Sequence, residues 1–145
     1  MYMNRVNRRR MAGVTLLELM AVVTVIGVLG MIALPSYRQY VMRAQRTEAK
    51  TGLLRLQTNQ ERFYLANRRY GTIAELVAAN LGSATTENGT YALTIVGNDA
   101  LTYTATATPV AGARIDMTQD TDCTSLSITA QGVKTFTGNP AATCW

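Results

Sequence analysis

Apolar residues fill one long segment near the start of the chain. The run extends from Val14 to Leu34 and contains a single charged residue, Glu18. As a helix of about 21 residues it would be about 31 Å long, enough to cross the hydrocarbon core of a membrane. The run is too long for an ordinary secretory signal, and no Ala-x-Ala cleavage site follows it. The pattern therefore predicts a membrane anchor.

Helical periodicity continues beyond the anchor. Apolar side chains recur every seven residues, and two further positions on the same face follow four residues after two of them: Met42, Ala49, Leu53, Leu56, Gln60 and Phe63. We expect this stripe to face a sheet, and the charged residues between its turns, Arg46 among them, to face water or neighbouring molecules. No stop signal appears before Asn67, so one helix is predicted from Val14 to about Ala66.

Three residues interrupt the anchor and predict a kink or local melting near Met31 to Pro35: Gly27, Gly30 and Pro35. Beyond Asn67 a short helix is expected at Ile73 to Ala79, and then the pattern changes to alternation with turn residues between the strands. Four strands are predicted, with a turn over residues 97–99 and an end to the second strand at Pro109: 90–96, 101–108, 123–129 and 133–136. The predicted fold class is α+β, a four-stranded antiparallel sheet lying on the exposed half of one long helix.

Charge and cysteine content refine this prediction. The formal charge of +5 would fall to +1 without residues 1–13, which hold four arginines and no acid. Those arginines favour a cytoplasmic N-terminus for the anchor. If the rest of the chain lies outside the cytoplasm, a disulfide between Cys123 and Cys144 is expected, which would also hold Trp145 against the domain. Two buried free thiols are the alternative.

Candidate catalytic and metal-binding groups are few. The chain has no histidine, no glycine-rich phosphate loop and no closely spaced cysteine pair, so we expect neither catalysis nor a cofactor or metal. The acidic residues at 116, 120 and 122 lack the glycine and distal glutamate of a calcium loop, which favours a solvated loop. Asn88-Gly89-Thr90 fits a glycosylation sequon, but a tight turn is the better interpretation.

Basic residues alternate with aromatic ones near the end of the long helix. Arg62, Arg68 and Arg69 lie among three aromatic side chains, a composition found at nucleic-acid interfaces. The low charge beyond residue 13 and the slightly acidic second half of the chain favour a solvated helix end over such an interface. DNA therefore stands as a possible partner that the sequence does not favour.

The membrane glutamate admits two interpretations. If the chain were cut after Gly13, the new amine of Val14 would lie one helical turn before Glu18. Between two chains displaced along a common axis, the carboxylate of one could pair with the amine of the next and set their register. Taken alone, Glu18 is better explained as a side chain that reaches the lipid headgroups.

The segment Arg8-Arg-Arg-Met-Ala-Gly13-Val14-Thr-Leu-Leu-Glu18-Leu-Met, followed by Pro35, resembles the class III signal of type IV prepilins. The resemblance implies cleavage between Gly13 and Val14 by prepilin peptidase, N-methylation of Val14, and a role for Glu18 in assembly. It also implies the family fold and a disulfide from Cys123 to Cys144. Val14 departs from the phenylalanine usual at that place, which bears on methylation more than on cleavage.

The resemblance implies three parts of the chain: a leader (1–13), a transmembrane and filament-core half of the helix (14–41), and a periplasmic head (42–145). The C-terminal pattern looks most like the minor pilins of the PilE kind. We therefore expect a non-enzymatic minor subunit of a type IV pilus that supports pilus biogenesis, adhesion or twitching motility. Its expected partners are other pilins, prepilin peptidase, the inner-membrane assembly platform and inner-membrane lipid, before it enters the extracellular pilus. The alternatives are a DNA-receptor minor pilin and a pseudopilin of type II secretion.

Overall fold

The computed structural model describes residues 14–97, 99 and 101–145. The predicted leader, with its cleavage residue Gly13, lies outside the described residues, as does Asn98 of the predicted turn. The chain divides into two compact units, Met1–Arg38 and Gln39–Trp145.

The first unit contains the start of helix α1 (Leu16–Asn67). The Thr15 hydroxyl accepts the Glu18 backbone N–H at 3.2 Å and so satisfies one of the donors that a helix start leaves free. Every residue from Leu16 to Asn67 is helical, so the expected local melting near Met31 to Pro35 is wrong, while the kink stays a prediction. The helix holds an 18-residue window of mean hydropathy 2.4, none of it buried, that is long and apolar enough to span a membrane.

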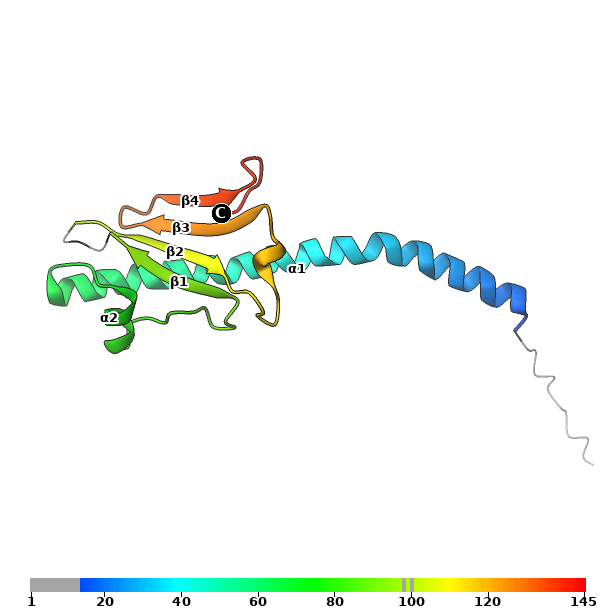
Figure 1. Ribbon diagram of the computed structural model, residues 1–145, viewed down its shortest axis with the longest axis horizontal. Coiled ribbons are helices and arrows are strands. Elements are labelled where there is room, and N and C mark those ends of the chain that lie inside the picture. The colour runs from blue at the N-terminus through cyan, green and yellow to red at the C-terminus, as the bar shows by residue number, and fades with distance from the viewer. Residues whose placement is uncertain (1–13, 98, 100) are drawn as a thin grey trace, which may run out of the picture. The chain divides into compact units, whose positions relative to one another are not determined.

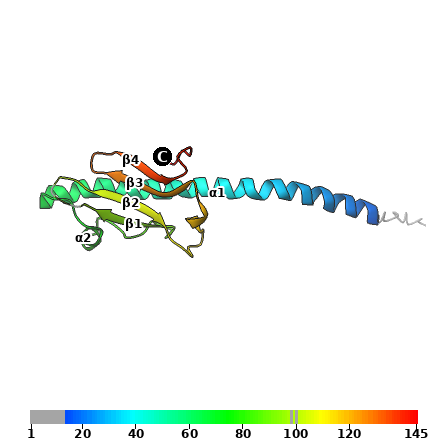
Figure 2. The same cartoon turned by 45° about the horizontal axis from the view of Figure 1, so that its top comes forward.

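The second unit places a four-stranded antiparallel sheet on α1 from Gln39 onward. The strands lie in chain order: β1 (Tyr91–Val96), β2 (Thr104–Pro109), β3 (Cys123–Thr129) and β4 (Lys134–Gly138). The views in Figure 1 and Figure 2 agree that the sheet covers one side of this part of the helix, with α2 (Ile73–Ala78) beside β1. The predicted fold class is confirmed.

The predicted stripe forms the helix side of the core. Ala49, Leu53, Leu56, Gln60 and Phe63 are all buried, and Met42 packs against the same cluster. The inward residues of the strands complete the core from the sheet side: Tyr91, Leu93, Ala105, Ala107, Cys123, Leu126 and Ile128. The expectation that Arg46 faces water is wrong, since the residue is only 8% exposed.

β1 begins one residue later than predicted, β4 is shifted to Lys134–Gly138, and both ends of β2 differ for local reasons. β2 begins at Thr104 rather than Leu101, because the Asp99 carboxylate accepts the N–H groups of Leu101 and Thr102 at 2.8 Å each and turns this segment back on itself. Pro109 is the last residue of β2, whereas the prediction placed it just beyond the end of the strand. It pairs with β1 beyond the region where β2 pairs with β3, so no ladder donor is missing there.

Candidate functional site

Helix α1 ends in a left-handed residue that sets the path of the chain. Arg68 has φ +58°, and its N–H donates to the Tyr64 carbonyl at 2.8 Å. A residue in this conformation normally closes a helix by satisfying one of its last carbonyls, although glycine is the usual choice. The Asn67 side-chain amide donates to the Phe63 carbonyl at 3.0 Å and satisfies another. These hydrogen bonds set the direction in which the backbone leaves the helix. The side chains of Arg68 and Arg69 are exposed there.

The chain after Arg69 is fixed by a buried glutamine. The Gln60 amide donates to the Gly71 carbonyl at 2.7 Å, and the Gly71 N–H donates back to the Gln60 side-chain oxygen at 2.9 Å. Gln60 is fully buried, so both of its hydrogen-bonding functions are used by one backbone unit. Any side chain at Gly71 would place its Cβ 2.6 Å from Leu76 and 2.9 Å from Phe63, which explains the glycine.

Three tyrosines form a row beside this turn. The ring centroids of Tyr64 and Tyr70 are 5.0 Å apart, and those of Tyr70 and Tyr103 are 4.8 Å apart with an edge-on geometry. The Tyr70 hydroxyl donates to the Glu61 carboxylate at 3.2 Å. Tyr64 and Tyr70 stay partly exposed, while Tyr103, the residue before β2, is buried. The row joins the helix end to the start of β2.

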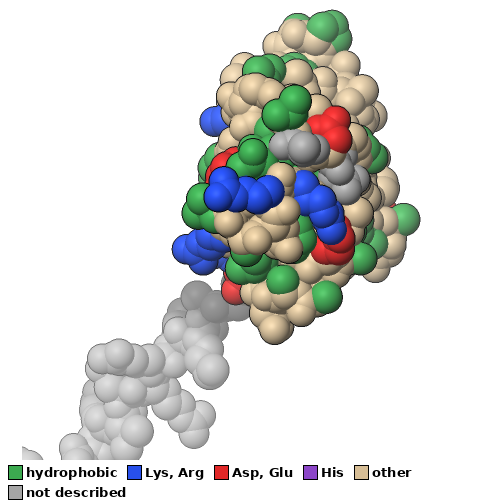
Figure 3. Space-filling model, turned by 90° about the vertical axis from the view of Figure 1, so that its left-hand side faces the viewer, with side chains coloured by type: hydrophobic (Ala, Val, Ile, Leu, Met, Phe, Trp, Pro, Cys, Tyr) green, Lys and Arg blue, Asp and Glu red, His purple; other side chains and the backbone are tan. Residues whose placement is uncertain are grey.

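At the C-terminal end of α1 lies a group of arginines that we call the basic end: Arg62, Arg68 and Arg69. Figure 3 shows that lysine and arginine side chains gather on the face that contains this end of the molecule, with a few acidic groups among them. The three arginines are not equivalent. Arg62 and Arg68 are exposed and form no ion pair with any residue that the structure describes.

Arg69, in contrast, is held by a carboxylate. Its two terminal nitrogens donate to the two oxygens of Glu75 at 3.1 and 2.5 Å, and its guanidinium lies 5.7 Å from the Phe63 ring centroid. Glu75 is also the N3 residue of a capping box at the start of α2, where it accepts the Thr72 N–H at 2.8 Å. The hydrogen bonds from Arg69, and then that from Thr72, lower the pKa of Glu75 to about 2.

The structure thus brings the three predicted arginines to one end of the head, but it buries Phe63 beneath them. Sequence reasoning missed Glu75 and the pairing of Gln60 with Gly71. The signal for Glu75 was present, because Thr72 and Glu75 have the spacing of a capping box ahead of an apolar run. No comparable local signal marks the bond from Gln60 to Gly71.

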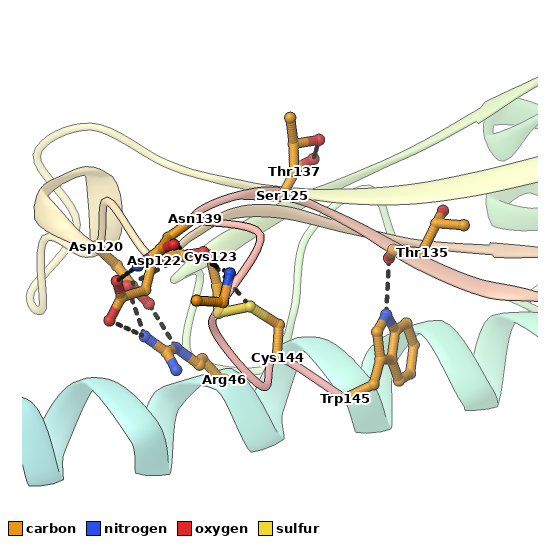
Figure 4. Close-up of a disulfide and its surroundings, with 11 residues drawn as sticks. Arg46, Asp120, Asp122, Cys123, Ser125, Thr135, Thr137, Asn139, Cys144 and Trp145 are labelled. Atoms are coloured by element: carbon orange, nitrogen blue, oxygen red, sulfur yellow. Dashed lines mark hydrogen bonds and ion pairs between the residues drawn. A yellow bond between two sulfur atoms is a disulfide. The ribbon is translucent and has the colours of Figure 1, made fainter.

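A second polar cluster joins α1 to the C-terminal part of the sheet (Figure 4). The Arg46 side chain donates twice to the Asp120 carboxylate, at 2.7 Å each, and its guanidinium lies 3.7 Å from Asp122. The Asp120 side chain is 2% exposed and also accepts the Cys123 N–H at 3.3 Å. The acidic loop therefore serves an internal ion pair. Among the described residues there is no acidic, histidine or cysteine cluster that could hold a metal ion.

The disulfide from Cys123 to Cys144 is present, which confirms the predicted bond. Next to it, the Trp145 indole donates to the Thr135 carbonyl at 2.7 Å, as Figure 4 shows, and the Lys134 ammonium lies 5.1 Å from the ring centroid. The C-terminal residues are thereby attached to both β3 and β4. This cluster stabilises the C-terminal part of the fold.

The sequon at Asn88 forms a tight turn tied to the helix. Glu48 accepts the Asn88 backbone N–H at 2.9 Å, the Asn88 side-chain amide at 3.1 Å and the Thr90 hydroxyl at 3.1 Å. Gly89 takes φ +69°, which a residue with a side chain rarely adopts. The arrangement accounts for the Asn-Gly pair as a turn.

The residues linked with processing and assembly lie in the first unit. Glu18 occupies the first turn of α1, where a carboxylate interacts favourably with the helix dipole, and it forms no ion pair with a described residue. An added Cβ at Gly27 or Gly30 would meet nothing within 4 Å in a single chain. The proposed roles of these residues in contacts between subunits therefore stay predictions, as do those of Gly13 and Val14.

Comparison with known proteins identifies the family. Residues 35–127, more than half of the chain, match the family model described as "Type IV minor pilin ComP, DNA uptake sequence receptor". The chain is 38% identical to the type IV major pilin protein PilA of Myxococcus xanthus over 51% of its own length, and 35% identical to fimbrial protein EcpC of Eikenella corrodens over 68%. It spans 33% and 65% of the lengths of these two relatives.

A solved structure shows the same fold. The non-core minor pilin PilV of Neisseria meningitidis matches 72% of this chain and 94% of its own, with 20% identity and a TM-score of 0.50. A type IV pilin from Shewanella oneidensis matches 72% of this chain and 97% of its own, with 20% identity and a TM-score of 0.48. Proteins of this family are structural subunits that assemble with other pilins into a pilus. From the family match over residues 35–127, the chain belongs to the type IV minor pilins.

Proposed function

We propose that this minor pilin is a DNA receptor, and that its basic end makes the contact. The observation that carries the proposal is the pair of exposed arginines, Arg62 and Arg68, which have no carboxylate partner among the described residues. They are close in sequence to the partly exposed Tyr64 and Tyr70, in a chain whose matching family is described by DNA uptake. The sequence alone did not favour a DNA receptor. The family match now gives that alternative the greater weight.

The expected interaction is electrostatic and modest in strength. Two unpaired arginines can each neutralise one phosphate, so the logarithm of the binding constant should fall with the logarithm of salt with a slope of about −1.8. The tyrosine rings can add stacking on bases or sugars, which tolerates many sequences. Sequence discrimination must come from contacts with base edges in addition to these.

The test is DNA binding by the full chain in nanodiscs of neutral lipid. The variant Arg62→Gln/Arg68→Gln keeps the aliphatic stems but removes two charges, and it should weaken binding to a 24-bp duplex at least tenfold and lower the salt slope by about 1.8. A control, Arg114→Gln, removes an exposed arginine remote in sequence from the basic end. Equal losses in the control and in single variants of the basic end would overturn the assignment of the site.

We further propose that the first unit assembles the subunit. Residues 1–13 would be the leader, cleavage between Gly13 and Val14 would free the amine, N-methylation would follow, and Glu18 would pair with the amine of a neighbouring pilin. The supporting observation is that the apolar residues from Val14 to Leu34 are exposed along this segment, which requires lipid before assembly and other helices afterwards. This proposal includes storage in the inner membrane with a periplasmic head, extraction by the assembly platform and final residence in an extracellular pilus.

The variant Glu18→Ala separates assembly from processing. Mass spectrometry of the membrane-bound protein should show the same mature N-terminus, beginning at Val14, in the variant and the wild type. Recovery of the subunit in sheared pili should fall strongly for the variant only. Normal recovery in pili at equal expression would remove Glu18 from the assembly contact.

A further inference from the structure

Glu75 places a carboxylate where a phosphate would bind Arg69. The two Arg69 nitrogens meet the two carboxylate oxygens in the side-by-side geometry that a guanidinium also uses for phosphate. The Arg69 side chain is 46% exposed and that of Glu75 is 36% exposed, so an anion can approach the pair from solvent. Arg69 is also the direct chain neighbour of Arg68, one of the two cations of this surface that form no ion pair with a described residue.

When the pair opens, Glu75 Oε2 keeps its hydrogen bonds from Thr72, while Oε1, which only Arg69 contacts among the described residues, is left to water. Glu75 is anchored independently of Arg69, because it accepts the Thr72 N–H at 2.8 Å and the Thr72 hydroxyl at 3.1 Å. If a phosphate took the guanidinium, the carboxylate would keep these bonds and its place in the capping box. Exposed ion pairs contribute little to stability, so exchange of one anion for another is a small perturbation of the fold.

We infer that Glu75 is a built-in competitor for nucleic-acid phosphate at Arg69. DNA must displace the carboxylate before Arg69 can join Arg62 and Arg68, and this lowers affinity for any duplex that offers phosphates alone. A duplex that also makes base contacts at the basic end can overcome the competition. Glu75 would thus limit the affinity of the DNA site for phosphate, and the inference rests on the proposed function.

The variant Glu75→Gln tests the inference while preserving the fold. Glutamine also serves at this position of a capping box, so α2 keeps its cap while the charge is lost. Its matched control is Glu87→Gln, which removes the same charge from the exposed ion pair between Glu87 and Arg55 at 3.6 Å. Arg55 lies about 10.5 Å before Arg62 along the helix, outside the basic end.

The measurement is binding of the full chain in neutral nanodiscs to a random-sequence 24-bp duplex between 0.05 and about 0.5 M salt. One added phosphate contact steepens the salt slope by about 0.9, which corresponds to about eightfold tighter binding near 0.1 M salt. Glu75→Gln should show this gain, Glu87→Gln should stay within about twofold of wild type, and Arg69→Gln/Glu75→Gln should lose the gain. Circular dichroism melting confirms that each variant is folded.

Three outcomes are distinct. If Glu75→Gln and Glu87→Gln strengthen binding equally, only net charge matters and the competition at Arg69 is refuted. If Glu75→Gln gains affinity and the gain persists in the double variant, Arg69 is not the group released, and the inference also fails. If Arg62→Gln/Arg68→Gln binds the duplex as well as wild type, it is the proposed DNA site itself that fails.

Discussion

Removing the Arg46 side chain should be among the most damaging single changes to the head. The variant Arg46→Met leaves Asp120, 2% exposed, with one remaining hydrogen bond from the Cys123 N–H at 3.3 Å. Breaking a buried ion pair by removing one partner typically costs about 3–5 kcal/mol, because the other charge stays buried without compensation. Methionine replaces most of the aliphatic volume, so little of this loss comes from packing.

Removing the charge of the partner, Asp120, should cost less unfolding free energy. This difference between the two partners is the sharpest test of the prediction. In Asp120→Asn the guanidinium keeps a second carboxylate nearby, since Asp122 lies 3.7 Å away and its side chain is 54% exposed and free to adjust. We therefore expect a loss of about 1–2 kcal/mol for Asp120→Asn. The double variant Arg46→Met/Asp120→Leu should recover most of the stability, because an apolar replacement of a buried pair is often neutral.

Urea unfolding of the oxidised full chain in a mild non-ionic detergent measures these differences. Trp145 is the sole tryptophan and lies beside the disulfide, so its fluorescence reports on the C-terminal part of the head. The midpoint should shift without a change in the urea dependence of the unfolding free energy. A cost below about 1 kcal/mol for Arg46→Met, or an equal cost for Asp120→Asn, would show that an uncompensated buried Asp120 charge is not the source of the loss.

Further predictions follow from the disulfide, the buried amide and the capping carboxylate. Cys144→Ser opens a cross-link with a sequence separation of 21, and urea unfolding should show a loss of about 3 kcal/mol that reductant reproduces in the wild type. Gln60→Leu strips the Gly71 N–H and carbonyl of their partners, and the same assay should show a loss of about 2–4 kcal/mol. Because the pKa of Glu75 is about 2 in the folded head and about 4.3 when unfolded, its stabilising effect is complete above pH ~4.3 and disappears toward pH 2. The melting temperatures of wild type and Glu75→Gln should therefore converge over that range on acidification, and a constant difference would contradict the assignment.

Patterns that depend on neighbouring residues were sufficient to predict the architecture. The heptad-spaced stripe from Met42 to Phe63 identified the buried face of α1, and alternation identified β3 with its observed ends, Cys123 and Thr129. Both patterns arise because side chains repeat every 3.6 residues in a helix and every two in a strand. The start of β2 was missed because Asp99, outside the strand, binds the backbone of Leu101 and Thr102.

Arg46 shows where this reasoning fails. It lies four residues after Met42 and three before Ala49, so its spacing places it on the buried stripe as firmly as that of Gln60. Its charge predicted that Arg46 would be exposed to solvent. The residue that allows its burial instead, Asp120, is 74 positions away. A buried charge is stable only with its partner, so the helix pattern predicts the position of Arg46 whereas its burial depends on tertiary structure.

The basic end shows the same limit for function. The sequence alone does not distinguish the three arginines as phosphate ligands. In the fold, the left-handed turn at Arg68 and the capping box of α2 bring Glu75 to Arg69 alone. Net charge is then a poor measure of phosphate affinity, because a cation that already holds a carboxylate gains little by exchanging it for a phosphate. The relevant quantity is the number of cations without an internal anion, and that number is set by the fold. A chain with a modest net charge can therefore present a DNA-binding surface, provided that its few free arginines lie together.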